Sequence, residues 1–251
     1  MTRYDTIGVT YSSTRRADPR VAARIVDALG DAWRVRRVVN VGAGTGNYEP
    51  TDRAVVAVDP SQTMLRQRSR GSAPAVCASA EELPFREDAF DAALAVLTVH
   101  HWTDLDAGLR EMQRVAPRQV VFFFEPEWAD RLWLVSEYFP EILDLATERA
   151  APGSEVLGAV LDIRRVESVP VPADCVDGFG GCFWNRPEKY LEPAVQDGMS
   201  CFAQLDPDVR ALGTEHLRDD IASGVWDARH GSLRTMREAD LGYRLLVAGL
   251  P

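Results

Sequence analysis

The fold class is decided by one stretch near the N-terminus, VVNVGAGTGN at residues 38–47. A short β-branched run there is followed by glycines at alternate positions, Gly42, Gly44 and Gly46. Glycine permits a tight turn and a close approach of the backbone to a ligand, and α/β folds bind ligands at the carboxyl ends of their strands. The stretch therefore predicts a strand followed by a ligand-binding loop.

Strand and helix signals alternate on both sides of this loop. Apolar runs typical of strands are found at 37–41, 54–58, 75–77, 90–97 and 119–124, with helical spacing at 18–30, 61–65 and 103–115. Two later runs, 166–171 and 241–247, are expected to add a sixth and a seventh strand. Alternation of this kind is typical of a parallel sheet with helices on both faces. We therefore expect an α/β fold with a Rossmann-like, seven-stranded, mostly parallel sheet.

The second half of the chain has a different pattern. Residues 128–149 have helical apolar spacing, which Pro140 should kink or split. The chain beyond is irregular and rich in aromatic residues, with one helix expected at 208–221. Because no linker or repeat divides the chain, we expect a single domain over residues 1–251, with a helical insertion or cap within residues 126–240.

The composition limits the possible partners. The chain has 38 acidic and 28 basic residues among 251, a formal net charge of −10, and a surface this acidic repels nucleic-acid phosphates and anionic lipids. The N-terminus lacks the apolar stretch of a signal peptide, and no apolar run approaches the roughly 20 residues of a membrane span. The four cysteines have no metal-ligand spacing. We expect a cytoplasmic protein that acts on a small molecule, without metal, nucleic acid or membrane.

The spacing of the glycine loop separates two classes of cofactor. A dinucleotide loop reads GxGxxG, whereas this loop reads GxGxG and has Asn47 in the place of the third glycine. That spacing suits a loop around the methionine end of S-adenosylmethionine (SAM) better than one that presents amides to a pyrophosphate. A purely structural glycine turn and an NAD-dependent oxidoreductase remain as alternatives.

Asp59 closes the next strand and is followed by Pro60. A carboxylate at this position can accept hydrogen bonds from both ribose hydroxyls. NAD and SAM sites both use such a residue, so Asp59 does not distinguish them, and it could also be a strand-end aspartate that only begins a turn. The connection before this strand, residues 47–53, is too short for the usual crossover helix.

A third segment does distinguish the two classes. It reads CASAEELPF at residues 77–85 and is followed by an FD pair at 90–91. Taken with the glycine loop and Asp59, it resembles the class I SAM-dependent methyltransferases, in particular the methyltransferase type 11 group, which is similar to ubiquinone/menaquinone C-methyltransferases. The resemblance runs from about residue 38 to residue 124, and it implies SAM as the cofactor.

The resemblance also implies where the cofactor is held. It places Ser79, Ala80 and Glu81 at the adenine and makes residues 1–17 a lid over the site. Asn40 is a departure, because the family usually has an acidic residue at the start of the glycine loop. Ser79 is another, because family members often have aspartate there. The cofactor contacts that all these features indicate are Tyr11, Arg16, Asn40, Gly42, Ala43, Gly44, Gly46, Asp59, Pro60, Ser79, Ala80, Glu81 and Leu97.

Candidate catalytic residues follow the fourth and fifth predicted strands. One of His100 and His101 could act as a general base near neutral pH, or both could only orient their loop. Glu125 could contact the acceptor and take its proton, or it could cap the next helix. The candidate acceptor contacts, each of which could instead be a core or surface residue, are Trp102, Trp128, Trp133, Tyr138, Trp184, Arg186 and Tyr190.

The expected function is transfer of a methyl group from SAM to an oxygen, nitrogen or carbon nucleophile of a small metabolite by in-line displacement. The protein's main task is then to align nucleophile, methyl carbon and sulfur, which is worth about 7–11 kcal/mol in the best intramolecular models. Two alternatives stay open, namely methylation of a peptide or protein group and a SAM-binding protein without transferase activity. The oligomeric state stays open as well.

Overall fold

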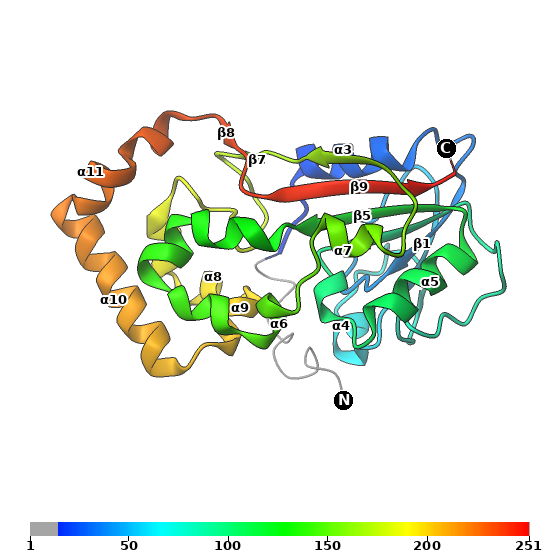
Figure 1. The fold of residues 1–251 in the computed structure, drawn as a ribbon, viewed down its shortest axis with the longest axis horizontal. Coiled ribbons are helices and arrows are strands. Elements are labelled where there is room, and N and C mark those ends of the chain that lie inside the picture. Colours follow the sequence, from blue (N-terminus) through cyan, green and yellow to red (C-terminus); the bar gives the residue numbers. More distant parts are fainter. Residues whose placement is uncertain (1–14, 251) are drawn as a thin grey trace.

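The fold is built around one twisted sheet, shown in Figure 1, which presents a computed structural model that describes residues 15–250. The sheet has seven strands in the order β3-β2-β1-β4-β5-β9-β6. They are β1 (Arg37–Val41), β2 (Ala54–Val58), β3 (Ala75–Val76), β4 (Ala92–Val96), β5 (Arg118–Phe124), β6 (Ile163–Ser168) and β9 (Tyr243–Gly249). The first five strands pair in parallel, and β9 is antiparallel to both of its neighbours. The expected Rossmann-like, mostly parallel sheet is confirmed.

The strand order explains where a ligand can bind. The chain proceeds outward from β1 to β3 and then returns to the other side of β1 to form β4. The connections on the two sides of β1 therefore diverge and leave a crevice at the carboxyl ends of β1 and β4, which is the usual ligand site of such sheets. The glycine loop follows β1 and enters this crevice directly.

Helices cover both faces of the sheet (Figure 1). On one face lies α3 (Pro19–Leu29), which begins where the Asp18 side chain accepts a hydrogen bond from the backbone N–H of Arg20 and buries Ile25 and Leu29 against the sheet. On the other face lies α5 (Leu105–Val115), capped by Asp104 in the same way, together with the short α7 (Ser154–Gly158). Helices α3 and α5 bury the apolar stripes that their sequences predict.

The connection between β1 and β2 contains only turns, as its length predicts. Residues 42–53, all described, form no helix, and α4 (Gln62–Arg66) follows only after β2. The sheet face that a crossover helix would cover is instead packed by α3 and by the segment at 169–184, whose buried side chains join the same core.

A second group of short helices forms a cap at the end of the sheet where β5 ends (Figure 1). We use the name helical cap for residues 126–149 and 187–235. Its elements are η3 (Pro126–Arg131), η4 (Leu134–Tyr138), η5 (Pro140–Asp144), α6 (Ala146–Arg149), η6 (Pro187–Leu191), α8 (Pro193–Asp197), α9 (Ser200–Gln204), α10 (Pro207–Ser223), α11 (Val225–His230) and η7 (Gly231–Thr235). A ribbon of β7 (Val171–Pro172) and β8 (Glu238–Ala239) joins the cap to the sheet.

The structure corrects two boundaries in this half of the chain. The helical pattern at 128–149 is divided into three single turns and a short helix, and Pro140 begins one of those turns because its ring fixes φ and removes an N–H donor. The sixth strand lies at Ile163–Ser168 and not at 166–171. It is an edge strand with mostly exposed side chains, and two arginines near its start weaken the apolar signal. The helix expected at 208–221 is confirmed as α10.

None of the helices between residues 15 and 250 has both the length and the apolar character that a membrane crossing requires.

Candidate active site

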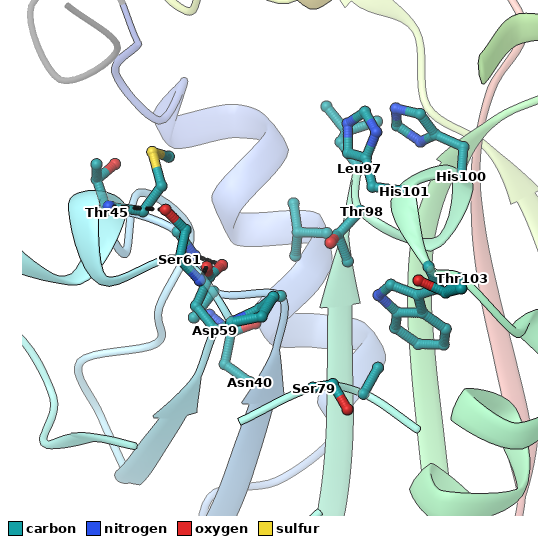
Figure 2. A pocket seen from close by; sticks show the side chains of 18 of the residues that line it. Asn40, Thr45, Asp59, Ser61, Ser79, Leu97, Thr98, His100, His101 and Thr103 are labelled. Carbon is teal, nitrogen blue, oxygen red and sulfur yellow. Dashed lines mark hydrogen bonds between the residues drawn. The ribbon is translucent and has the colours of Figure 1, made fainter. Parts of the chain in front are cut away.

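A cavity of about 610 Å³ opens at the carboxyl ends of the central strands. Asn40 of β1, Asp59 after β2, Ser79 after β3 and Leu97 after β4 all line it, and Figure 2 shows these side chains around one space. The residues come from four strands that lie side by side in the sheet. The crevice that the topology predicts is therefore a real cavity.

The glycine loop forms one wall of this cavity. Gly42, Gly44 and Gly46 have φ angles of 71°, 51° and 89°, a backbone region that other residues rarely adopt. A Cβ atom added to Gly42 would lie 2.0 Å from Oγ1 of Thr98. The loop can therefore approach the end of β4 only because this position has no side chain.

Asp59 fixes the glycine loop from the neighbouring strand. Its Oδ2 accepts a hydrogen bond of 2.8 Å from the backbone N–H of Gly44, and its Oδ1 accepts one of 2.8 Å from the backbone N–H of Ser61. The side chain is buried, yet it lines the cavity. A carboxylate offers about four lone-pair sites, so these bonds leave Asp59 able to accept from a ligand as well.

Two buried oxygens at the cavity wall lack a hydrogen-bond partner. Oδ1 of Asn40 and Oγ1 of Thr45 accept from or donate to no group that the structure describes. The Asn40 amide nitrogen faces Glu49, to which it donates at 3.5 Å, and Glu49 is in turn paired with Arg68 at 2.7 Å. An unsatisfied buried acceptor costs about 1–3 kcal/mol. These oxygens fit a ligand that brings its own donors, such as an ammonium group.

Glu81 links the segment after β3 to the segment after β4, at the end of the cavity away from the glycine loop. Its carboxylate accepts hydrogen bonds of 2.8 Å and 3.3 Å from the backbone N–H groups of Thr103 and Asp104. Burial by itself raises the pKa of Glu81, but backbone hydrogen bonds and one from the Ser79 side chain outweigh burial and lower that pKa overall. Glu81 therefore stays ionised and holds residues 79–81 against the loop that follows β4.

The turn after β4 carries both histidines. It is the single helical turn η2 (Val99–His101), in which the ring centroids of His100 and His101 lie 3.8 Å apart. Burial, with a smaller contribution from the positive charge of Arg15, lowers the pKa of His100 to about 4. His100 is therefore uncharged at neutral pH and can accept a hydrogen bond.

A second, smaller cavity of about 140 Å³ adjoins the first. The two share Arg15, Leu97, His100 and His101 as lining residues. Leu97 has a φ of 49°, a conformation that costs about 1–3 kcal/mol in a residue other than glycine and is common at functional sites. The walls of the smaller cavity are mostly apolar and include Phe123, Phe124, Leu132, Leu134, Val135, Ile142 and Met199.

Comparisons with known proteins agree with this geometry. The model of a family described as a methyltransferase domain matches residues 39–124, which include the glycine loop, Asp59 and both histidines. Residues 39–124 thus match a methyltransferase domain, and they supply five strands of the sheet.

Two curated relatives are similar to this domain over part of their length. Malonyl-[acyl-carrier protein] O-methyltransferase of Halorhodospira halophila is 36% identical over 143 residues, 49% of this chain and 47% of the relative. Demethylmenaquinone methyltransferase of Corynebacterium urealyticum is 33% identical over 127 residues, 45% of this chain and 53% of the relative. The chain thus spans about half the length of these relatives.

One solved structure is similar over nearly the whole chain. It is described as a candidate methyltransferase from an antibiotic biosynthesis pathway of Anabaena variabilis, with 29% identity and a TM-score of 0.85. The likeness covers 94% of this chain and 99% of that one. It therefore includes the helical cap as well as the methyltransferase domain.

Most of the expected cofactor contacts line the larger cavity, and three do not. Tyr11 lies outside the described residues. Arg16 is exposed, and the cavity is lined by Arg15 instead. Gly46 flanks the cavity without lining it, and the expected contacts that do line it are Asn40, Gly42, Ala43, Gly44, Asp59, Pro60, Ser79, Ala80, Glu81 and Leu97.

Glu125 is bonded to the start of a later helix and does not face the cavities. Its two carboxylate oxygens accept from the backbone N–H of Ser154 at 3.2 Å and 3.1 Å, at the start of α7. Glu125 lines neither of the two cavities. Glu125 therefore does not cap the next helix, η3, whose N-terminus receives no side-chain bond from it, but supports the start of the later helix α7.

Most of the aromatic residues expected at the acceptor are core residues instead. Trp133, Tyr138 and Tyr190 pack in the core of the helical cap, and Trp184 packs in the core on one face of the sheet. Trp133 donates from Nε1 to the carbonyl of Trp184 at 2.8 Å, and Tyr138 donates to Asp220 at 2.8 Å. Among the described residues, the expected acceptor contacts that line neither cavity are Trp128, Trp133, Tyr138, Trp184, Arg186 and Tyr190. Trp102 lines the larger cavity, which is the candidate cofactor site, and not the smaller one.

Arg186 and Trp128 have other partners. Arg186 donates to the carbonyl oxygens of Cys175 and Cys182 at 2.8 Å and 3.3 Å, so it stabilises a loop. The Trp128 ring lies against the guanidinium groups of Arg131 and Arg244. Neither side chain is placed to contact an acceptor in the smaller cavity.

Two lining residues were not among the expected contacts. Arg15 belongs to the expected lid at residues 1–17, of which residues 1–14 lie outside the described part of the chain, and Glu148 had no expected role. Arg15 pairs at 2.7 Å with the fully buried Asp177, which also accepts from the Tyr48 hydroxyl at 2.6 Å. Only the path of the chain before α3 decides that Arg15 and not Arg16 faces the cavities, so no sequence signal identifies it. Glu148 lies on α6, a helix of one turn without a recognisable motif.

Proposed function

We propose that this protein binds SAM in the larger cavity and transfers its methyl group to a small molecule held in the smaller one. One observation carries the proposal: the cavity around the glycine loop adjoins an apolar cavity, and Leu97 and His100 line both. A donor and an acceptor can therefore meet at this junction. A protein that only sensed SAM would have no need of the second cavity.

The residues of the larger cavity fit SAM from end to end. The glycine loop, with the unpartnered oxygens of Asn40 and Thr45, suits the methionine end and its ammonium group. Asp59 suits the ribose hydroxyls. Ser79 and Glu81 lie at the opposite end, where the resemblance places the adenine.

Methyl transfer requires mainly that the nucleophile, the methyl carbon and the sulfur atom lie in line. When bound, SAM supplies an electrophilic methyl group that passes to a lone pair of the acceptor, while the electron pair of the broken C–S bond stays on a neutral thioether. Leu97 is held in its unusual conformation by a hydrogen bond of 2.7 Å from its N–H to the carbonyl of Phe122, so it forms a rigid wall at the junction. His100 is uncharged at neutral pH, so it can accept a hydrogen bond from the nucleophile and orient its lone pair toward the methyl group.

A small molecule is the acceptor that the geometry favours over a peptide or protein group. The smaller cavity has about the volume of an engineered cavity of about 150 Å³ that holds a benzene molecule. The relatives are named for a quinone and for a malonyl group on a carrier protein. We further propose that sheet and helical cap act as one domain, because η4, η5, α6 and α9 supply walls of the smaller cavity.

Titration with S-adenosylhomocysteine, the product left by SAM, tests the proposed function. We expect this ligand to bind and to raise the melting temperature, since a ligand at one hundred times its Kd stabilises the folded state by about 2.7 kcal/mol. NAD should neither bind nor stabilise. Calorimetry that shows binding of NAD and none of S-adenosylhomocysteine would overturn the proposed function and favour an oxidoreductase.

A further inference from the structure

Helix α6 separates the two cavities and faces both. Ala146, Thr147 and Ala150 line the larger cavity, whereas Glu148 lines the smaller one. The helix packs against η2, the turn that carries the two histidines. Glu148 therefore lies in the wall of the candidate acceptor pocket, on the cap side of His100.

Glu148 brings a carboxylate into apolar surroundings without a partner. Its carboxylate makes no hydrogen bond or ion pair with any described residue. Burial raises the pKa of this carboxyl group. Glu148 is half-buried. A carboxylate that is withdrawn from water without a partner is unfavourable, and it is retained more readily where a ligand supplies the missing partner.

Three other polar residues that line the smaller cavity do not neutralise Glu148. Arg15 is paired with Asp177, and His100 is uncharged at neutral pH because burial lowers its pKa. Burial, and after it the negative charge of Glu148, raises the pKa of the Cys201 thiol to about 12, so Cys201 is uncharged too. Arg15 is thus held by Asp177, and neither His100 nor Cys201 offers a positive charge, so a bound cation would supply the partner that the Glu148 carboxyl group lacks.

We propose that the methyl acceptor is a small amine, whose ring-sized apolar body fills the smaller cavity and whose protonated amino group pairs with Glu148. This inference rests on the proposed function. A protonated amine has no lone pair with which to attack the methyl group, so the amino group at Glu148 is a recognition group. The methylated atom is a different atom of the same molecule, near His100 at the junction of the cavities.

Three matched probes test this inference on the protein saturated with S-adenosylhomocysteine. They are 2-phenylethylamine, 2-phenylethanol and 3-phenylpropanoate, which share a phenyl ring and a two-carbon tether but end in a cation, a neutral hydroxyl and an anion. We expect calorimetry to show that the amine binds about tenfold or more tightly than the alcohol, because a charged pair is stronger than a neutral hydrogen bond. The carboxylate should bind weakest of the three.

A charge-removing variant assigns the preference to one residue. Glu148→Gln should bring the affinities for the amine and the alcohol to within about threefold of each other, since only the charge is lost. Glu141→Gln is the matched control, because Glu141 is exposed on η5 in the same cap and the variant loses the same charge. It should keep the full preference.

The outcomes that contradict the inference are separate from those that contradict the proposed function. Equal affinity for the three probes, tighter binding of the alcohol or binding of none of them would overturn the assignment of an amine. These results come from the unaltered protein, so they do not depend on whether Glu148→Gln folds. Failure to bind S-adenosylhomocysteine in the first place would instead overturn the proposed function.

Discussion

Replacing Gly42 with alanine is expected to weaken binding of S-adenosylhomocysteine by about a hundredfold or more. Gly42 has a φ of 71°, a conformation that costs about 1–3 kcal/mol for other residues. In addition, the new Cβ would lie 2.0 Å from Oγ1 and 2.8 Å from Cβ of Thr98. The loop must then move away from β4, and every backbone group that faces the ligand moves with it. Calorimetry gives the change in Kd, and a melting curve shows whether the variant remains folded.

Two further variants distinguish the effect of displacing the glycine loop from the effect of any glycine-to-alanine substitution. Gly71→Ala adds the same methyl group where no described atom lies within 4 Å, so it should leave the Kd unchanged. Thr98→Gly in the Gly42→Ala background removes the overlapping side chain but leaves the backbone strain, so it should restore part of the affinity. A folded Gly42→Ala variant with the original Kd would show that the loop does not hold the ligand.

Replacing Asp59 with alanine is expected to weaken the same binding by about ten- to a hundredfold, because hydrogen bonds to a charged group are worth about 1.5–3 kcal/mol. The change removes the acceptor expected for the ribose hydroxyls. It also leaves the N–H groups of Gly44 and Ser61 without their acceptor, so the glycine loop loses its support from β2. Asp59→Asn retains the shape of the side chain and should give a smaller loss.

The control for Asp59 is an aspartate with the same charge on the surface. Asp106 lies in the first turn of α5, paired with Arg110 at the exposed surface, and Asp106→Ala should bind S-adenosylhomocysteine as the original protein does. If Asp59→Ala is folded and its Kd is unchanged, Asp59 is only a turn residue and the ribose is held elsewhere.

The sheet could be predicted because each strand shows its burial in its own short run of residues. Strands β4 and β5 are buried on both faces and therefore read as continuous apolar runs. The loop needs glycine where φ is positive, so its conformation could be recognised from the spacing of its glycines. The edge strand β6 was misplaced for the converse reason, since most of its side chains are exposed and its pattern carries little information.

The acceptor side could not be predicted in the same way. Aromatic side chains are dense in the second half of the chain, but density does not tell a pocket from a core. Trp133 packs edge-on against Tyr138, Tyr190 and Trp226, and these rings form the interior of the helical cap. The smaller cavity is lined mostly by aliphatic and phenylalanine side chains that carry no motif in the sequence. Glu148 reaches it only because α6 packs on η2.

A crystal structure with S-adenosylhomocysteine tests the central claim most directly. We expect the sulfur atom at the junction lined by Leu97 and His100, open to the apolar cavity, with the ribose on Asp59 and the adenine beside Ser79 and Glu81. A ligand bound in the reverse direction, or a sulfur atom closed off from the cavity that Glu148 lines, would contradict the account of methyl transfer at this site.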